Sequence, residues 1–460
     1  MGHIKTYTTD RLGTRSVGKL LFEFSLPAMI GMLVNAFYNI VDRIYVGQGV
    51  DPLGIAGISM SMPVVLVLMA SSMFIGVGAN ALFSIRLGEG RRDEVEKIMG
   101  HAFVLLFLVP AVFIVAGFIF IDEILRDLVG ASEEVFPYAK TYLQIILYGG
   151  VFSAMGPGIN HFIRSDGHPR TSMFTQILGA VINIILDPIF IFVFDMGIAG
   201  AAWATIISQF ISFVWVMLYF NSRWTTLRFR LRAMRLERKL CLNIMAIGFA
   251  PFAMQAAIGL INGILNNRLA YYGGDVAVTA MGIVFSIHII LIMLLQGLTQ
   301  GMQPIIGYNY GAGNYDRVRR VYFLAAKSAT IFVFCGFIFL EAFPSFFIAA
   351  FHNEAGALMD LSVRALRMVS FAFPVVGFQI VTSSFFQAIG KPVQGTVLSL
   401  SRQILFFIPV VIFFPRFTGL DGVFLTFPIS DFCAVTLSAL ILRREWKYLK
   451  VNAKTQAAVE

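Results

Sequence analysis

The feature that most constrains this chain is a series of long apolar stretches that covers nearly its whole length. About 20 consecutive apolar residues form a helix long enough to cross the hydrocarbon core of a bilayer. Only 13% of the residues are charged, roughly half the share found in soluble domains. The sequence therefore predicts an all-α, multi-pass integral membrane protein. The twelve predicted spans are 18–46, 53–80, 98–121, 135–162, 170–194, 197–220, 241–271, 276–306, 317–343, 358–387, 394–414 and 421–442.

Basic residues are concentrated on one side of these spans. The loop between the sixth and seventh spans holds Arg223, Arg228, Arg230, Arg232, Arg235, Arg238 and Lys239, whereas loops on the opposite side hold little beyond Arg126, Arg268 and Arg416. Because short cytoplasmic loops carry an excess of Lys and Arg, both termini are expected in the cytoplasm, with the protein in the inner cell membrane. The net charge of +9 is then a topology signal and an anionic-lipid contact, not a sign of nucleic-acid binding.

The second half of the chain repeats the first. Gly88, Gly90, Asp93 and Val95 recur 223 residues later as Gly311, Gly313, Asp316 and Val318, and Gly78, Gly167 and Pro169 recur as Gly301, Gly390 and Pro392. Six spans per repeat would insert both halves the same way, as in secondary transporters built from parallel repeats. The predicted divisions are an N-terminal segment 1–17, an N-half 18–221, a basic linker 222–240, a C-half 241–443 and a tail 444–460.

The fifth span carries the strongest candidate site. Asn183 and Asp187 are four residues apart and share one face of a helix. Pro188 follows at once and, lacking an N–H, leaves the carbonyl of Ile184 without its helical partner. An ionisable group at membrane depth is costly unless it is paired or lines a wet cavity, so Asp187 is a functional candidate.

Asp42 in the first span and Thr205 in the sixth are expected at the depth of Asp187. All three lie about 5 to 8 residues from the external ends of their helices, roughly 7–12 Å in. Asp42, Asn183, Asp187 and Thr205 offer only oxygen ligands, which suits Na⁺ or, on the acids, protons. No resident cofactor is expected. The alternative is that the two acids only cross-link helices.

Further polar residues leave two interpretations open. Tyr38, Asn39, Tyr142 and Asn160 either line a cavity around the acids or make ordinary interhelical hydrogen bonds. In the C-half, Asp431 is either a helix-packing group or part of a second polar site, and Arg402 is expected to extend its side chain toward the membrane surface.

Several motifs in this order resemble the multidrug and toxic compound extrusion (MATE) family over about residues 15 to 445. They are Pro27 and Pro251 near the start of spans 1 and 7, the Gly-x-Gly turns at 88–90 and 311–313, the Gly-x-Pro turns at 167–169 and 390–392, and Asn-x-x-x-Asp-Pro at 183–188. The resemblance implies an antiporter that exports amphipathic, mostly cationic compounds in exchange for H⁺ or Na⁺ and so confers drug resistance. The chain is most similar to the bacterial and archaeal branch with coupling carboxylates in the N-terminal bundle, whose pattern falls on Asp42, Asn183, Asp187 and Thr205.

Two other classes of function are alternatives to the transport of drugs. A flippase of lipid-linked intermediates has a related architecture, but it would be expected to carry more spans or a cluster of positive charge in its cleft. A membrane-embedded enzyme would need a motif such as His-Glu-x-x-His or Gly-x-Ser-x-Gly, and the sequence has neither. We expect a non-enzymatic monomer whose partners are small amphipathic substrates and membrane lipids.

Overall fold

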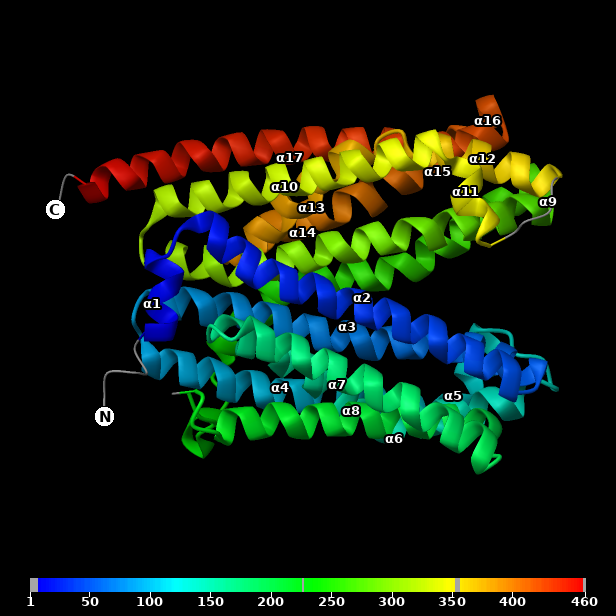
Figure 1. The fold of residues 1–460 in the computed structure, drawn as a ribbon, viewed down its shortest axis with the longest axis horizontal. Helices are drawn as coiled ribbons and strands as arrows, with labels where there is room; N and C mark the ends of the chain where they lie inside the picture. The colour runs from blue at the N-terminus through cyan, green and yellow to red at the C-terminus, as the bar shows by residue number, and fades with distance from the viewer. Residues whose placement is uncertain (1–6, 226, 352–355, 458–460) are drawn as a thin grey trace.

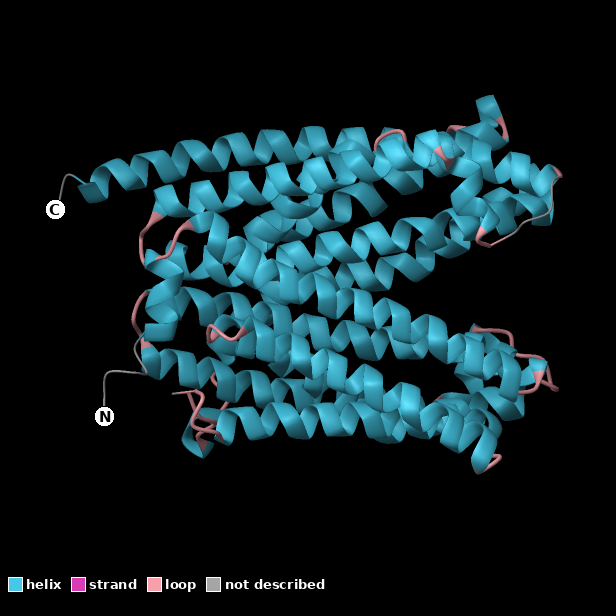
Figure 2. Cartoon of the chain, in the orientation of Figure 1, coloured by secondary structure: helices cyan, strands magenta, loops and turns pink. Residues whose placement is uncertain are grey.

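The structure is a computed structural model that describes residues 7–225, 227–351 and 356–457. In this part of the chain every regular element is a helix (Figure 2). The N-half contains α1 (Tyr7–Thr14), α2 (Val17–Gly49), α3 (Pro52–Gly88), α4 (Arg92–Ile119), α5 (Ile121–Glu123), the π-helix η1 (Ile124–Leu128), α6 (Phe136–Ser165), α7 (Pro169–Pro188), the π-helix η2 (Ile189–Val193) and α8 (Gly197–Asn221).

The C-half follows a linker that holds one short 3₁₀ helix, η3 (Leu231–Met234). Its helices are α9 (Arg238–Gly311), α10 (Tyr315–Ala342), α11 (Pro344–Ala349), α12 (Ala357–Ser370), α13 (Phe373–Ala388), α14 (Pro392–Leu400), the π-helix η4 (Ser401–Phe407), α15 (Ile408–Phe413), α16 (Pro415–Thr418) and α17 (Leu420–Ala457).

The helices account for the twelve predicted spans. Among the described residues, ten helices are long and apolar enough to cross a membrane, and the pair α12 and α13, bent by 49°, makes an eleventh. Helix α9 has 74 residues, about 110 Å at 1.5 Å per residue, which is far longer than a bilayer is thick. The chain turns back within it at Gly274, whose φ of 65° a residue without a Cβ adopts easily. The prediction of an all-α membrane protein is confirmed, and α9 supplies two of its spans.

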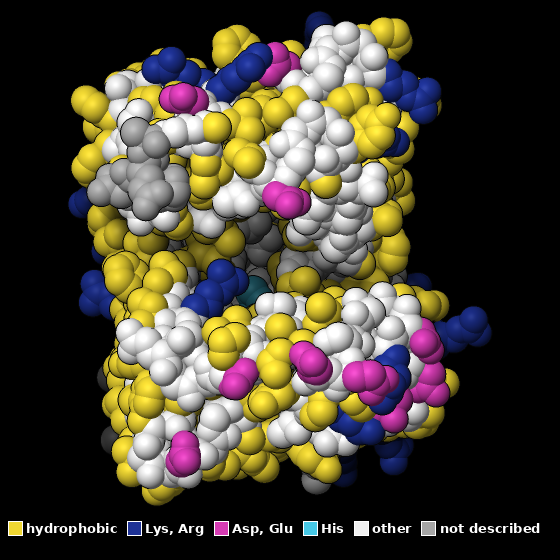
Figure 3. Space-filling model, turned by 90° about the vertical axis from the view of Figure 1, so that its right-hand side faces the viewer, with side chains coloured by type: hydrophobic (Ala, Val, Ile, Leu, Met, Phe, Trp, Pro, Cys, Tyr) yellow, Lys and Arg dark blue, Asp and Glu magenta, His cyan; other side chains and the backbone are white. Residues whose placement is uncertain are grey.

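The two halves of the chain form two bundles that lie side by side. In Figure 1 the helices from α2 to α8 occupy the lower bundle, those from α10 to α17 occupy the upper one, and both termini lie at the same end. Each half has its own apolar cores: two clusters draw chiefly on the N-half and two on the C-half. At the end opposite the termini the surface is hollowed between the bundles (Figure 3).

Near the termini the bundles meet through glycines. A Cβ added to Gly88 would lie 1.9 Å from the carbonyl oxygen of Tyr308, and one added to Gly311 would lie 2.0 Å from that of Ile85. These are the same two positions of the repeat, each pressed against the backbone of the other half. Because only hydrogen fits there, any other side chain at either position would push the bundles apart at this end.

Helix α1 joins the bundles at the same end. It belongs to the N-half by sequence, yet Leu12 is part of a C-half apolar core. The Asn309 side chain donates a hydrogen bond to the carbonyl of Leu12 at 3.0 Å, and Arg317 donates to the carbonyls of Leu12 and Arg15. These contacts hold the start of the chain against the ends of α9 and α10.

Candidate functional site

The polar residues of the fifth span lie in the interior of the N-half. Asn183 and Asp187 on α7 are 2% and 0% exposed, and the Asn183 amide donates to an Asp187 carboxylate oxygen at 3.4 Å. Pro188 is the last residue of α7, and the chain continues as the π-helix η2. A proline removes one helical hydrogen bond, and π-turns are frequent at functional sites, so the helix is locally irregular beside the acid.

Asp42 on α2 meets Asp187 on α7 across the bundle. The two carboxyl groups lie within hydrogen-bonding reach of each other. The phenol rings of Tyr38 on α2 and Tyr142 on α6 lie close enough to interact electrostatically with both acids. Helix α2 and the consecutive helices α6 and α7, about 90 residues or more further along the chain, thus bring two carboxyl groups, one amide and two phenols together.

Part of this cluster has no hydrogen-bond partner among the described residues. The side-chain oxygen of Asn183 and the second carboxylate oxygen of Asp187 are buried and accept no hydrogen bond from the described residues. Arg43, the sequence neighbour of Asp42, acts on it electrostatically, but no ion pair of the described chain includes Asp42 or Asp187. Two nearby carboxylates without an ion-pair partner repel each other unless a proton or a cation lies between them. The donor set, all oxygen and partly unsatisfied, fits Na⁺ or H⁺.

The other candidates lie at varying distances from this cluster. Thr205 is on α8, which packs against α7, and its hydroxyl donates to the carbonyl of Ala201 at 3.0 Å. Asn39 is exposed and donates to the carbonyl of Asn35 at 2.6 Å. Asn160 is buried near the other end of α6, about 27 Å along the helix from Tyr142, and donates to the carbonyl of Ser172. Asn160 therefore lies apart from the acids.

The structure adds a polar contact that the sequence reasoning missed. The amide of Asn35 on α2 donates to Gln176 on α7 at 3.1 Å. Gln176 precedes Asp187 by 11 residues, three helical turns, and so lies on the same face as Asn183 and Asp187. The spacing of Gln176, Asn183 and Asp187 places them along one face of a helix, so the sequence alone could have identified Gln176 as part of this polar face.

The C-half contains a buried ion pair instead. Arg402 on η4 lies 2.5 Å from a carboxylate oxygen of Asp431 on α17, whose side chain is 3% exposed. The prediction that Arg402 extends toward the membrane surface is wrong, because the guanidinium turns inward to neutralise this acid. Nearby, the ring of His288 on α9 is hydrogen-bonded to the Ser370 hydroxyl at 2.8 Å.

One arginine lies at the boundary between the halves. Arg164, which the sequence placed in a loop, is inside α6 and only 3% exposed. Its guanidinium donates to the Ser172 hydroxyl at 3.3 Å and to the carbonyl of Gln300, in the other half, at 3.5 Å. Pro304 follows Gln300 by four residues and lacks the N–H that would otherwise bind this carbonyl. Arg164 thus links the two bundles.

Known proteins are similar to this chain in sequence and in fold. The MatE family model matches residues 27–189 and 244–413, once in each half. The chain is 27% identical to the multidrug export protein MepA of Staphylococcus saprophyticus over 93% of this chain and 94% of that protein.

Solved structures share the fold over nearly the whole chain. The MATE multidrug transporter DinF-BH is 35% identical, with a TM-score of 0.88 over 95% of this chain and 98% of that one. An outward-facing multidrug resistance MATE transporter of the MOP superfamily has a TM-score of 0.90 over 97% and 99% of the two chains, at 24% identity.

A family model that matches both halves, relatives along nearly the full length, and two six-span bundles all agree on one assignment. The chain belongs to the MATE (MatE) family of membrane transporters and is not an enzyme.

Proposed function

We propose that this chain exports amphipathic, mostly cationic compounds from the cell in exchange for H⁺ or Na⁺, by alternating access between its two bundles. Asp42, Asn183 and Asp187 take up the coupling cation, with Thr205 contributing its hydroxyl oxygen. The named activities of MepA, a multidrug export protein, and of DinF-BH, a multidrug transporter, support this class of substrate.

The observation that carries the proposal is that Asp42 and Asp187 lie together without an ion-pair partner in the described ranges of the chain. A structural acid inside a membrane bundle is normally paired, since an uncompensated charge there costs several kcal/mol. Here the buried second oxygen of Asp187 and the Asn183 side-chain oxygen remain free to accept. A proton or Na⁺ arriving from outside would complete the cluster, which couples its occupancy to the packing of α2 against α7.

The arrangement of the bundles supports an outward-open state. With both termini in the cytoplasm, as the basic loops predict, the hollow in Figure 3 faces the cell exterior. The glycine contacts at Gly88 and Gly311 close the cytoplasmic end. The partly exposed Asp42 then lies in the open half, where an external cation can reach it, and the buried Asp187 lies beside it. Cation uptake shifts the α2–α7 packing, the bundles rock, and the substrate has left before the cytoplasmic side opens.

The driving force is sufficient for export. One elementary charge crossing 100 mV is worth about 2.3 kcal/mol, so a proton entering at roughly 150 mV releases about 3.5 kcal/mol. That energy sustains a gradient of a few hundredfold for a neutral substrate. Export of a monovalent cationic substrate against the membrane potential costs the electrical energy that one entering proton releases. Two protons carried by the pair of acids would leave a net electrical driving force.

The test is export of a fluorescent lipophilic cation from proteoliposomes, driven in turn by a proton gradient and by a Na⁺ gradient. Wild type should export under one of them, and Asp42→Asn should not. Asp195→Asn is the matched control: it removes one exposed charge at the same end of the fifth span, and Asn tolerates the φ of 52° at this position. Undiminished export by Asp42→Asn, or none by folded wild type, overturns the proposal.

A further inference from the structure

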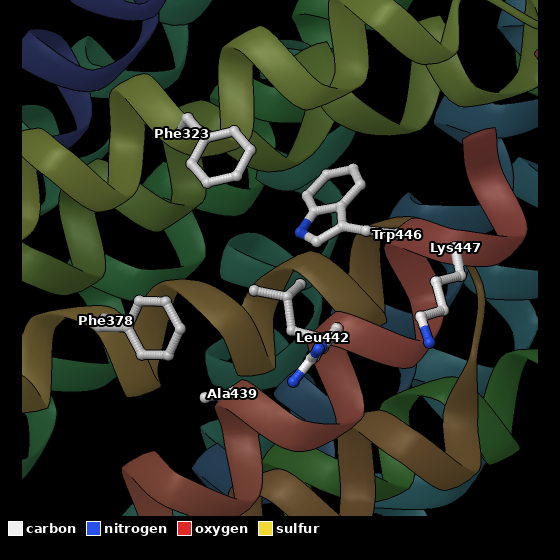
Figure 4. A pocket seen from close by; sticks show the side chains of 7 residues that line it. Phe323, Phe378, Ala439, Leu442, Trp446 and Lys447 are labelled. Atoms are coloured by element: carbon white, nitrogen blue, oxygen red, sulfur yellow. The ribbon is translucent and has the colours of Figure 1, made fainter.

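A pocket opens on the outer side of the C-half, away from the boundary between the bundles. It lies between α10, α13 and α17 near the end that carries the termini, with a volume of about 360 Å³ (Figure 4). Its lining residues are Phe323, Phe378, Ala439, Leu442, Arg443, Trp446 and Lys447. The volume is at the lower end of the range for small-ligand sites, and the lining is mainly apolar with a few polar groups.

Trp446 gives the pocket a fixed polar point. Its ring is stacked on Phe323 with centroids 5.6 Å apart and an interplanar angle of 19°, and it also contacts the rings of Tyr322 and Phe385. Its indole nitrogen is buried and has no hydrogen-bond partner among the described residues. In Figure 4 this nitrogen faces the space bounded by Phe323, Phe378 and Leu442. A buried N–H without an acceptor is costly, so an acceptor that reached this nitrogen would stabilise the occupied pocket.

The rim of the pocket is basic. Arg443 and Lys447 are one helical turn apart on α17 and are both exposed. The guanidinium of Arg319 lies 5.6 Å from the centre of the Phe323 ring. The acid closest in sequence, Glu445, is bound by Lys391 at 2.7 Å and so does not neutralise the rim.

The pocket changes from apolar to cationic along the membrane normal. Phe378 and Ala439 lie deeper in the bundle, whereas Arg443 and Lys447 lie toward the ends of the helices. Phe323, which is 47% exposed, opens it to the surroundings. Lys327, four residues after Phe323, is on the same face of α10 and can extend its side chain to the rim. A molecule that fits must carry an apolar chain and an anionic head.

We propose that this pocket binds one anionic phospholipid of the leaflet on the termini side. An acyl chain lies against Phe323, Phe378 and Leu442, a head-group oxygen accepts from the Trp446 indole, and the phosphate lies beside Arg443 and Lys447. Basic pockets between membrane helices hold anionic lipid head groups in this way. The lipid fills the crevice between α10, α13 and α17 and ties these helices together.

Trp446 itself reports the occupant, because bromine atoms on an acyl chain quench a nearby indole. Wild type and Trp446→Phe are reconstituted in phosphatidylcholine with increasing brominated phosphatidylglycerol, and in parallel with brominated phosphatidylcholine. The chain has four tryptophans, including Trp446. The difference in fluorescence between the two proteins isolates the signal of Trp446 from that of the other three. Quenching of Trp446 is expected to saturate at about fivefold lower mole fraction of phosphatidylglycerol, which is about 1 kcal/mol.

Three variants locate the effect. Arg443→Gln should abolish the preference for the anionic lipid, whereas Arg444→Gln, which removes the same charge from the next position of α17, should keep it. Ala439→Leu narrows the apolar part without changing charge and should reduce quenching by both lipids. Equal quenching of wild type by the two lipids, or equal loss in Arg443→Gln and Arg444→Gln, overturns the specific site. Absence of any Trp446 quenching would mean that protein covers the pocket, and it too overturns the proposal.

Discussion

The two halves share one architecture but treat their buried charges in opposite ways. In the N-half, Asp42 and Asp187 lie together, and no basic residue in the described part of the chain forms an ion pair with either acid. In the C-half, Asp431 is bound by Arg402 at 2.5 Å. The buried acid of the C-half thus has a counter-charge within the protein, whereas no described residue supplies one to the acids of the N-half.

The repeat shows that this difference arose at particular positions. Shifted by 223 residues, Asp187 corresponds to Val410, while Arg402 and Asp431 correspond to Gly179 and Ser208. At Gly179 the space is filled by the other helix: an added Cβ would lie 2.5 Å from the Ser212 hydroxyl. The N-half packs its helices closely where the C-half has an ion pair. This contrast supports the proposal that the acids of the N-half, and not Asp431, take up the coupling cation.

The largest effect should come from removing the free acid. Asp187→Asn keeps the size and the contact to Asn183 but cannot hold a proton or a charge, so gradient-driven export should fall to the level of empty liposomes. Expression and thermal unfolding should be close to wild type, because no partner loses its counter-charge. The measurement is dye export under the gradient that drives wild type. Full export by this variant would remove the functional contrast between the halves.

Breaking the C-half pair should instead cost stability. Asp431→Asn leaves the Arg402 guanidinium without its carboxylate, which typically costs about 3 kcal/mol. The double variant Arg402→Gln/Asp431→Asn should recover most of the loss and should still export. Thermal unfolding of the purified proteins checks this order. If the double variant is no more stable than the single one, the pair is not the source of the stability.

The closed end can be tested at a single glycine. Gly88→Val puts a side chain where a Cβ would lie 1.9 Å from the Tyr308 carbonyl oxygen. The strain, about 1 to 3 kcal/mol, should shift the protein toward the state in which this end is open. Spin labels at Arg92 and Tyr315, the first residues of α4 and α10, should move apart. Gly263→Val, with no atom within 4 Å of the added Cβ, should leave the distance unchanged.

The smallest effect on stability is expected from the polar contacts that fix the turns after the fourth and tenth spans. In the C-half, Lys391 binds Glu445; in the N-half, the Tyr219 phenol donates to Asp166 at 2.8 Å. Burial raises the pKa of Asp166, against the lowering effect of hydrogen bonds from Thr225 and Tyr219. A raised pKa means that the folded state holds the proton more tightly, so this group's contribution to stability falls as pH rises through that pKa.

Tyr219→Phe removes a hydrogen bond that favours the carboxylate, so the pKa of Asp166 should rise further. The variant should be close to wild type below about pH 4, and its deficit should grow toward about 1 kcal/mol by neutral pH. Unfolding temperatures measured across this range check the sign. A deficit that shrinks as pH rises would contradict the assigned role of Asp166.

Much of the fold could be predicted from the sequence, because membrane-spanning helices are recognised by their length and apolar composition. The turn at Gly274 was predicted, since one span was expected to end at residue 271 and the next to begin at 276, and the chain does turn back at this glycine between the two spans of α9. The bend between α12 and α13 was not foreseen, because Phe371 and Ala372 between them are as apolar as the helices they join.

The candidate site could be predicted only in part from the sequence. Asn183 and Asp187 share a helix face by their spacing alone, and Asp42 could be placed at the same depth by counting residues. Gln176 was missed although its spacing was available. The contact between Asn35 and Gln176 joins two helices, and no periodicity within one helix predicts which face of another it meets.

The sequence by itself determined the twelve spans, the two repeats and the placement of two acids at one level of the N-half. Those properties depend on local length, hydropathy and helical periodicity. Only the tertiary structure decided that Asp431 has Arg402 as its ion-pair partner and that Arg164 reaches across to the other half. It also decided that Asp42 and Asp187 have no ion-pair partner among the residues that the structure describes. The partner of a charge is set by how distant helices rotate and pack, and this is a property of the whole fold.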